Sequence, residues 1–134
     1  MNLNQVTIPS ANLSKAIPFY EALGLQLIVS TSDRYARFKC PNGEATFSIH
    51  LTDQLSKGPR TIVYFETENL DREVDQLLAL GIHFDLLPVD QPWLWREAHL
   101  KDPDGNPVIL YHAGKNRLNP PWKLKNRNNA FFKG

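Results

Sequence analysis

The alternation of hydrophobic and polar positions predicts a strand, a helix and three further strands in the first half of the chain. The β-branched run at residues 6–8 predicts the first strand, and apolar residues at helical spacing from Leu13 to Leu23 predict the helix. Pro18 lies inside this helix, where it predicts a kink or a regular part confined to the residues after it. The three strand-like segments that follow are residues 25–30, 34–39 and 45–51.

The second half of the chain shows the same order of elements. A strand is predicted at residues 61–67, and a helix follows with Leu70, Val74, Leu77 and Leu78 on one face. The turn sequence Asp-Pro-Asp-Gly-Asn at residues 102–106 separates the last two strands. The three strands after the helix are predicted at residues 82–87, 95–101 and 107–112.

Both predicted helices carry start and stop signals. Asn12 or Ser10 can cap the first helix and Asn69 the second, while Gly24 and Gly81 end them. At an offset of 57 positions, Asn-Leu at 12–13 aligns with Asn-Leu at 69–70, and Ala-Leu-Gly at 22–24 aligns with Ala-Leu-Gly at 79–81. The chain therefore contains an internal repeat.

The repeat predicts a single α+β domain over residues 1–113, followed by a C-terminal arm over residues 114–134. The domain consists of tandem βαβββ modules at residues 1–57 and 58–113. One such module leaves a sheet face without a partner, so two modules side by side predict curved mixed sheets that enclose a shared cavity. A small ligand is expected to bind in such a cavity.

Composition and charge refine this picture. The 134 residues are 42% hydrophobic and 22% charged, which is ordinary for a globular domain and excludes a disordered chain or a disulfide scaffold. The net charge of +1 is the sum of a basic arm and an acidic body. Residues 114–134 hold six basic residues and no acid, whereas residues 1–113 hold nine basic and fourteen acidic residues. The single Cys40, with no signal-like start and no membrane-length apolar run, predicts a cytoplasmic location.

Several local sequences together resemble the glyoxalase/bleomycin-resistance/extradiol-dioxygenase superfamily, also called the vicinal oxygen chelate (VOC) fold. The resemblance covers residues 3 to about 113 and rests on Val-Thr-Ile-Pro at 6–9, Asn-Leu at 12–13, Phe-Tyr at 19–20, Leu-Gly-Leu at 23–25 and the turn at 102–106. It implies a homodimer, which attraction between the basic arm and the acidic body would favour. It also implies that enzymes of the family hold a divalent metal between the sheets, using His, Gln or Glu from the first and last strand of each module.

The residues at these implied metal positions argue against a metal. The matching positions are Gln5, Ser48, Ile62 and Ile109, and isoleucine offers no lone pair. Gln5 and His50 would supply two ligands, whereas a divalent ion needs at least three. We therefore expect no metal and no cofactor, although a weak site that recruits another side chain stays open. Family members without the metal are typically ligand-binding or sequestering proteins.

Strand alternation predicts an apolar and aromatic cavity with a few polar groups, suited to a planar or partly hydrophobic organic ligand. His50 and Glu97 are candidates for an acid–base pair, or else a structural histidine and a solvated glutamate. The residues expected to face inward are Gln5, Thr7, Ser48, His50, Ile62, Tyr64, Trp95, Glu97, Ile109 and Tyr111, and the ligand-binding candidates among them are Gln5, Ser48, His50, Tyr64, Trp95, Glu97 and Tyr111.

Three functions are compatible with these patterns. The first is a small-molecule-binding protein without the metal, and the second is a lyase, isomerase or dioxygenase-like enzyme that uses a recruited metal or the His50/Glu97 pair. The third is a protein-interaction module. Neither a nucleic-acid nor a membrane partner is expected, and Trp122 in the basic arm is predicted to dock on the body or on a partner subunit.

Overall fold

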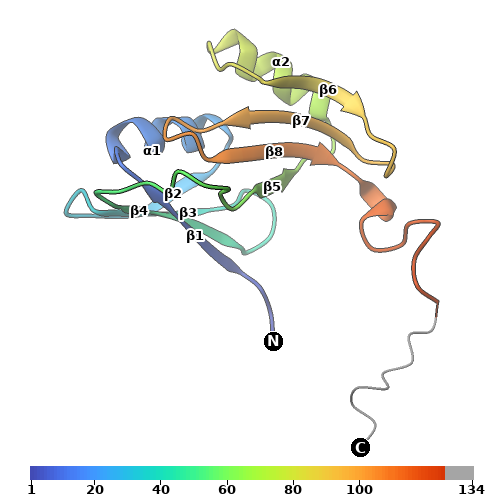
Figure 1. The fold of residues 1–134 in the computed structure, drawn as a ribbon, viewed down its shortest axis with the longest axis horizontal. Helices are drawn as coiled ribbons and strands as arrows, with labels where there is room; N and C mark the ends of the chain where they lie inside the picture. The colour runs from blue at the N-terminus through green and yellow to red at the C-terminus, as the bar shows by residue number, and fades with distance from the viewer. Residues whose placement is uncertain (126–134) are drawn as a thin grey trace, which may run out of the picture.

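The computed structural model describes residues 1–125, and it confirms the predicted α+β order of two βαβββ modules (Figure 1). The last nine residues of the predicted arm, 126–134, lie outside the described part. Module one contains β1 (Gln5–Ser10), α1 (Leu13–Ala22), β2 (Gln26–Thr31), β3 (Tyr35–Lys39) and β4 (Thr46–Leu51). Module two contains β5 (Val63–Glu66), α2 (Leu70–Ala79), β6 (Leu86–Asp90), β7 (Arg96–Lys101) and β8 (Pro107–His112), and the short 3-10 helix η1 (Gly114–Asn116) follows it.

Each module forms its own four-stranded mixed sheet. The strand orders are β1-β4-β3-β2 in sheet A and β5-β8-β7-β6 in sheet B, with β1–β4 and β5–β8 parallel and the other pairs antiparallel. A helix covers one face of each sheet, and we name the opposite face the open face. The prediction of sheets that enclose a cavity is corrected here, because within residues 1–125 the two sheets are not closed around a common space.

The helix ends follow the predicted signals only in part. The Asn12 side chain accepts from the backbone N–H of Lys15 at 3.3 Å, whereas Asn69 occupies the N-cap position of α2 without a side-chain hydrogen bond. Instead, Asp71 in the first turn of α2 interacts favourably with the helix dipole. The first helix runs through the exposed Pro18 from residue 13 to 22, so its regular part is not confined to the residues after the proline.

Strand β6 begins four residues later than the pattern predicts. Ile82 donates its backbone N–H to the carbonyl of Leu77, and Phe84 is buried in the core, so residues 82–84 connect the helix to the sheet, and the first bond to β7 is that of the Asp85 N–H to the carbonyl of His99 at 2.8 Å. Strand β5 is also shorter than predicted, and Ile62 lies outside it. Ile82 and Phe84 in the first of these connections pack in or against the core, which is why their pattern resembles that of a strand.

One hydrophobic core joins the helix-covered faces of both modules. Tyr20 and Phe38 are fully buried in module one, and Val74 of α2 is 1% exposed in module two. The ring of Phe47 on β4 contacts the ring of Phe65 on β5, with centroids 5.7 Å apart. The modules are therefore packed together through their helix sides, which leaves both open faces to solvent.

The turn at residues 102–106 ties module two to module one. The Asp102 carboxylate is buried and accepts from the Tyr20 hydroxyl at 2.7 Å, and from the backbone N–H and side-chain amide of Asn106 at 2.9 Å each. Asp104 accepts from the Ser10 hydroxyl and from the N–H of Ala11 at 2.8 Å. A motif that looks like a simple turn thus anchors the start of α1 in the other module.

Burial, together with the neighbouring Asp102 carboxylate, raises the pKa of Tyr20 far above its ordinary value. The unfolded chain ionises this phenol near pH 10 while the folded chain does not, so stability should fall by about 1.4 kcal/mol per pH unit above that point. In Tyr20→Phe this contribution should be absent, and the loss of one hydrogen bond should cost about 1–2 kcal/mol at neutral pH. Urea unfolding of both proteins between about pH 9 and 11 measures the difference; parallel slopes would contradict the assignment.

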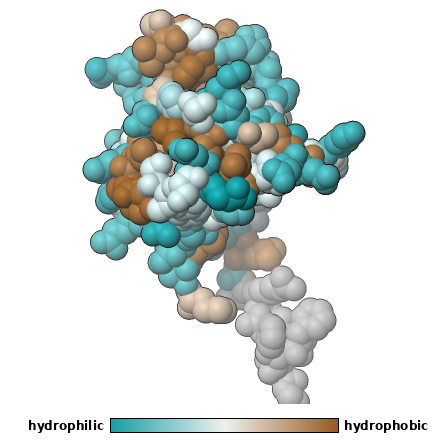
Figure 2. Space-filling model, turned by 90° about the vertical axis from the view of Figure 1, so that its left-hand side faces the viewer, coloured by the Kyte–Doolittle hydropathy of each residue, from teal (hydrophilic) through white to brown (hydrophobic). Residues whose placement is uncertain are grey.

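No helix in the described part of the chain is both long and apolar enough to span a membrane. Viewed from the left-hand side of Figure 1, the surface carries separate apolar patches among hydrophilic residues (Figure 2). This end of the molecule therefore presents no continuous apolar surface.

Candidate functional site

The open face of sheet A carries a chain of polar side chains. Gln5 donates through Nε2 to the hydroxyl of Ser48 at 2.7 Å and to that of Thr7 at 3.0 Å. The Tyr35 hydroxyl bonds to the same Ser48 oxygen at 2.7 Å and accepts from Nε of Arg37 at 2.9 Å. The predicted alternation on β4 is confirmed, because Phe47 and Ile49 point into the core and Ser48 lies under the polar chain.

The neighbours of Tyr35 on this face shift the pKa of its phenol. Burial opposes ionisation of the phenol, but hydrogen bonds with Ser48 and Arg37 outweigh that effect and lower its pKa below the ordinary value. His50 stands opposite Tyr35 in the strand register, and its side chain is exposed. Among the residues that the structure describes, the His50 imidazole makes no hydrogen bond with the other predicted site residues.

The four positions matched to the family's metal ligands do not suit a divalent metal. Gln5 and Ser48 are in contact, but their amide and hydroxyl are both engaged in hydrogen bonds with neighbours. Ile62 and Ile109 provide no donor atom. Residues 1–125 also contain no group of three His, Cys, Asp or Glu side chains placed to hold a metal. The side chains at these four positions therefore do not fit a divalent metal ion.

The open face of sheet B carries a cluster of aromatic rings, which we name the aromatic platform: Tyr64, Trp95 and Tyr111. Trp95 and Tyr111 stack with ring centroids 4.7 Å apart, and Tyr64 meets them edge-on at 6.0 and 5.6 Å. The indole N–H of Trp95 donates to the carbonyl of Asn116 at 3.3 Å, so η1 holds the ring in place. Tyr111 is buried, which raises the pKa of its phenol, whereas Tyr64 is 45% exposed. Three rings thus form one surface that a ligand can reach at Tyr64.

A buried carboxylate lies beside the aromatic platform. Glu97 is 2% exposed and pairs in register with Tyr111 on the neighbouring strand. It accepts from the indole N–H of Trp93 at 2.6 Å and contacts Nε2 of His99 at 2.8 Å. The structure therefore corrects the predicted His50/Glu97 pair, because the histidine bonded to Glu97 is His99 on the same strand.

The predicted site residues separate into two groups within one chain. Gln5, Ser48 and His50 lie on sheet A, and Tyr64, Trp95, Glu97 and Tyr111 lie on sheet B. No hydrogen bond or aromatic contact among residues 1–125 joins the two groups.

Four residues of these open faces were absent from the predicted site: Tyr35, Arg37, Trp93 and His99. A usable signal existed for His99 and Trp93, which share strand parity with Glu97. For Tyr35 and Arg37, the pairing of β3 with β4 in register decides the face, and that register is not visible in the sequence.

Comparison with known proteins agrees with this architecture. The chain is 25% identical over 127 residues to the uncharacterized protein YraH of Bacillus subtilis (strain 168), a match that covers 83% of this chain and 98% of the relative. Its fold is similar to that of a glyoxalase/bleomycin resistance protein/dioxygenase from Nocardioides, with a TM-score of 0.72, 21% identity and coverage of 93% and 90% of the two chains.

A bleomycin-binding protein solved in complex with bleomycin has a similar fold as well, with a TM-score of 0.69, 18% identity and coverage of 84% of this chain and 98% of its own. The model of the Glyoxalase/Bleomycin resistance protein/Dioxygenase superfamily matches residues 2–110, which include module one and module two up to the middle of β8. The chain belongs to this superfamily.

Proposed function

We propose that this protein binds a planar, partly hydrophobic organic molecule without a metal, on the open face of sheet B. The observation that supports the proposal is the aromatic platform beside a buried carboxylate. Trp95 and Tyr111 are fixed by stacking, and Tyr64 offers an exposed ring. Preorganised rings of this kind bind a flat ligand with little loss of conformational freedom. Family membership supports small-molecule binding in general, and the site residues support this narrower form.

The carboxylate of Glu97 further restricts the class of ligand that we expect to bind. In the described residues it is the only acid whose side chain is buried beside the platform. Its hydrogen-bond partners are the indole N–H of Trp93 and the imidazole of His99. A ligand with a cationic or hydrogen-bond-donating group would gain from this negative charge in a poorly solvated position. Bleomycin, the ligand of a structurally similar protein, is therefore one compound to test, together with simpler planar aromatic amines.

A homodimer in a reducing compartment such as the cytoplasm belongs to this proposal. The open faces leave Ile62 47% and Tyr64 45% exposed, and apolar side chains of this size are often covered in an assembly. Cys40 is a free thiol with no cysteine to pair with in the chain. A second copy over the open faces would also bring polar and aromatic groups toward one ligand.

A thermal-shift screen tests the proposal. The protein is stripped with EDTA and heated with a panel of planar aromatic compounds that includes bleomycin and aromatic amines. A ligand present at about 100 times its Kd should stabilise the fold by about 2.7 kcal/mol, which is a clear rise in Tm for a domain of this size. Aliphatic amines of equal charge serve as the matched panel, and a Tm that no aromatic compound raises would contradict the proposal.

The contact between Glu97 and His99 favours one alternative function, a proton-transferring enzyme of the lyase or isomerase type. The buried carboxylate orients an imidazole that is 36% exposed, at 2.8 Å, next to the proposed binding surface. This arrangement suits general acid–base catalysis on a bound ligand. Chemical change of a compound identified in the screen, lost in His99→Gln while binding persists, would support the enzyme over the binding protein.

A further inference from the structure

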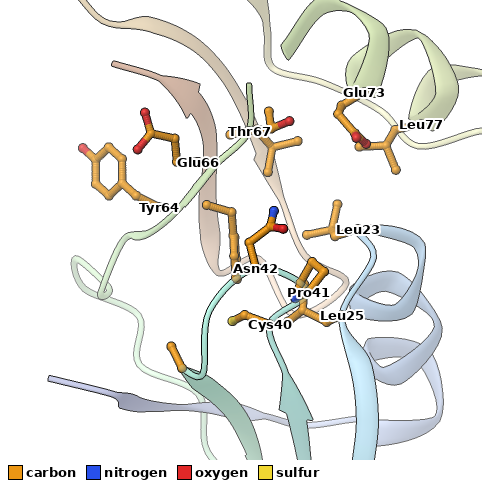
Figure 3. Close-up of a pocket in the computed structure, with 13 residues that line it drawn as sticks. Leu23, Leu25, Cys40, Pro41, Asn42, Tyr64, Glu66, Thr67, Glu73 and Leu77 are labelled. Atoms are coloured by element: carbon orange, nitrogen blue, oxygen red, sulfur yellow. The ribbon is translucent and has the colours of Figure 1, made fainter. Parts of the chain in front are cut away.

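A groove with a volume of about 350 Å³ lies where the two modules meet (Figure 3). Leu23 and Leu25 line it from the end of α1, and Leu77 of α2 and Leu110 of β8 line it from module two. Cys40 forms part of its wall. The volume falls within the range of pockets that bind small organic groups or apolar side chains. Of the predicted ligand-binding residues only Tyr64 reaches this groove, so the groove touches the proposed ligand surface at one ring and is otherwise separate from it.

The mouth of the groove is acidic. Glu73 lines it and, within residues 1–125, makes no ion pair and no side-chain hydrogen bond. Glu66 also lines it, but its carboxylate accepts from the N–H groups of Ala113 and Gly114 at 2.8 and 3.0 Å and is paired with Nε of Arg117 of the same chain at 3.8 Å. Glu68 lies in the adjoining hollow, which shares Glu66 with the groove. An occupant that is both apolar and basic would match this lining.

The C-terminal arm has that composition. After η1 the described part of the chain runs away from the body (Figure 1), and its large apolar side chains are exposed. Leu118, Trp122 and Leu124 are 63%, 56% and 70% exposed, and Lys123 and Lys125 alternate with the last two. An exposed tryptophan among basic residues is an uncommon surface feature and is typical of an interface residue.

A β-turn at residues 120–123 contains Trp122. The backbone N–H of Lys123 donates to the carbonyl of Pro120 at 3.0 Å, and Pro121 and Trp122 are the central residues of the turn. The Lys123 ammonium donates to the side chain of Asn119 at 2.9 Å. Because the proline and these bonds already order the turn, docking would cost little conformational entropy.

We propose that the groove binds the C-terminal arm of a second copy of this chain, with the Trp122 indole among the apolar residues and the lysines beside Glu73. Three observations support a second copy: the groove and the arm carry opposite charges, both expose apolar surface, and residues 118–125, the described part of the arm beyond Arg117, run away from their own body (Figure 1). The arm lies beyond residues 2–110, the part matched by the family model. It goes beyond the proposed ligand binding and does not depend on it.

Disulfide trapping between two versions of the full chain tests the contact. One version carries Cys40→Ser and Trp122→Cys, so its only thiol is on the arm, and the other is the unaltered chain, whose only thiol is Cys40 in the groove. Burial raises the pKa of the Cys40 thiol, so the mixture is oxidised with copper phenanthroline at alkaline pH. The matched control replaces Trp122→Cys with Leu87→Cys, because Leu87 is 55% exposed and outside the groove. Circular dichroism confirms that all versions fold.

The expected product is a heterodimer linked through positions 40 and 122, formed at least about tenfold faster than the control heterodimer, because a disulfide needs Cα atoms within about 7 Å. Glu73→Lys in the unaltered chain should slow trapping at least about threefold, while Asp75→Lys on the same helix should not. Equal rates for the arm and control thiols would overturn the proposal. So would an internal bond between positions 40 and 122 in monomers of the single variant Trp122→Cys, since it would show that the arm folds back on its own chain.

Discussion

Replacing Asp102 with alanine is expected to lower the free energy of unfolding by about 3–5 kcal/mol, the largest stability effect of any single polar residue in this fold. The carboxylate accepts bonds from the Tyr20 hydroxyl, from both nitrogens of Asn106 and from the N–H of Asp104. Alanine would leave the buried Tyr20 hydroxyl and the Asn106 amide groups without an acceptor. It would also loosen the turn through which Asp104 holds Ser10 and Ala11 in module one.

Equilibrium unfolding in urea measures this effect. Asp75→Ala is the matched control, because it removes a carboxylate from an exposed helix position and should change stability by no more than about 0.5 kcal/mol. A loss of less than about 1 kcal/mol for Asp102→Ala would show that the turn does not tie the modules together. A loss of several kcal/mol with an unchanged m value would support two modules that unfold as one unit.

Trp95→Ala should weaken binding of any compound identified in the thermal-shift screen by about 10- to 100-fold, which corresponds to about 1–3 kcal/mol of lost stacking. Trp95 stacks on Tyr111 and touches Tyr64, so its removal also frees the two remaining rings. Isothermal titration calorimetry in EDTA gives the Kd directly. Because the loss should come from the platform, enthalpy and affinity should both fall.

Leu80→Ala is the control for this prediction. It removes an apolar side chain that is 68% exposed and lies outside both the aromatic platform and the groove, so the Kd of the ligand should change less than about twofold. An equal loss in both variants would place the ligand elsewhere, and an unchanged Kd in Trp95→Ala would exclude the platform as its binding surface.

Local signals in the sequence predict most of the fold. In the predicted apolar stripe from Leu13 to Leu23, Leu13 and Tyr20 are buried and Ile17 and Leu23 are partly buried. Gly24 and Gly81 have φ of 96° and 87°, the left-handed conformation that ends a helix. Alternation on β4 and β7 correctly assigns Ser48 and Glu97 to the open faces, because each helix-covered face demands apolar residues at every second position.

Contacts between distant residues account for what the sequence does not show. The Asp102–Tyr20 bond joins residues 82 positions apart, and nothing near Asp102 indicates its partner. The bulge between Leu86 and Val89 shifts β6 against β7, which simple alternation cannot anticipate. Glu97 bonds to His99, which lies on the same face of the same strand, whereas its distance from His50 depends on how the two modules are arranged, to which the packing of Phe47 against Phe65 contributes.

The central claim is that a small planar molecule binds on the aromatic platform without a metal. The three tryptophans of the chain provide separate indole N–H signals in a ¹H–¹⁵N correlation spectrum, and single Trp→Phe variants assign them. The spectrum is recorded in EDTA while the compound from the screen is added. The account predicts that the signals of Trp93 and Trp95 shift until saturation while that of Trp122 stays in place. Shifts that appear only after a divalent metal is added, or that leave Trp95 unchanged at saturation, would contradict it.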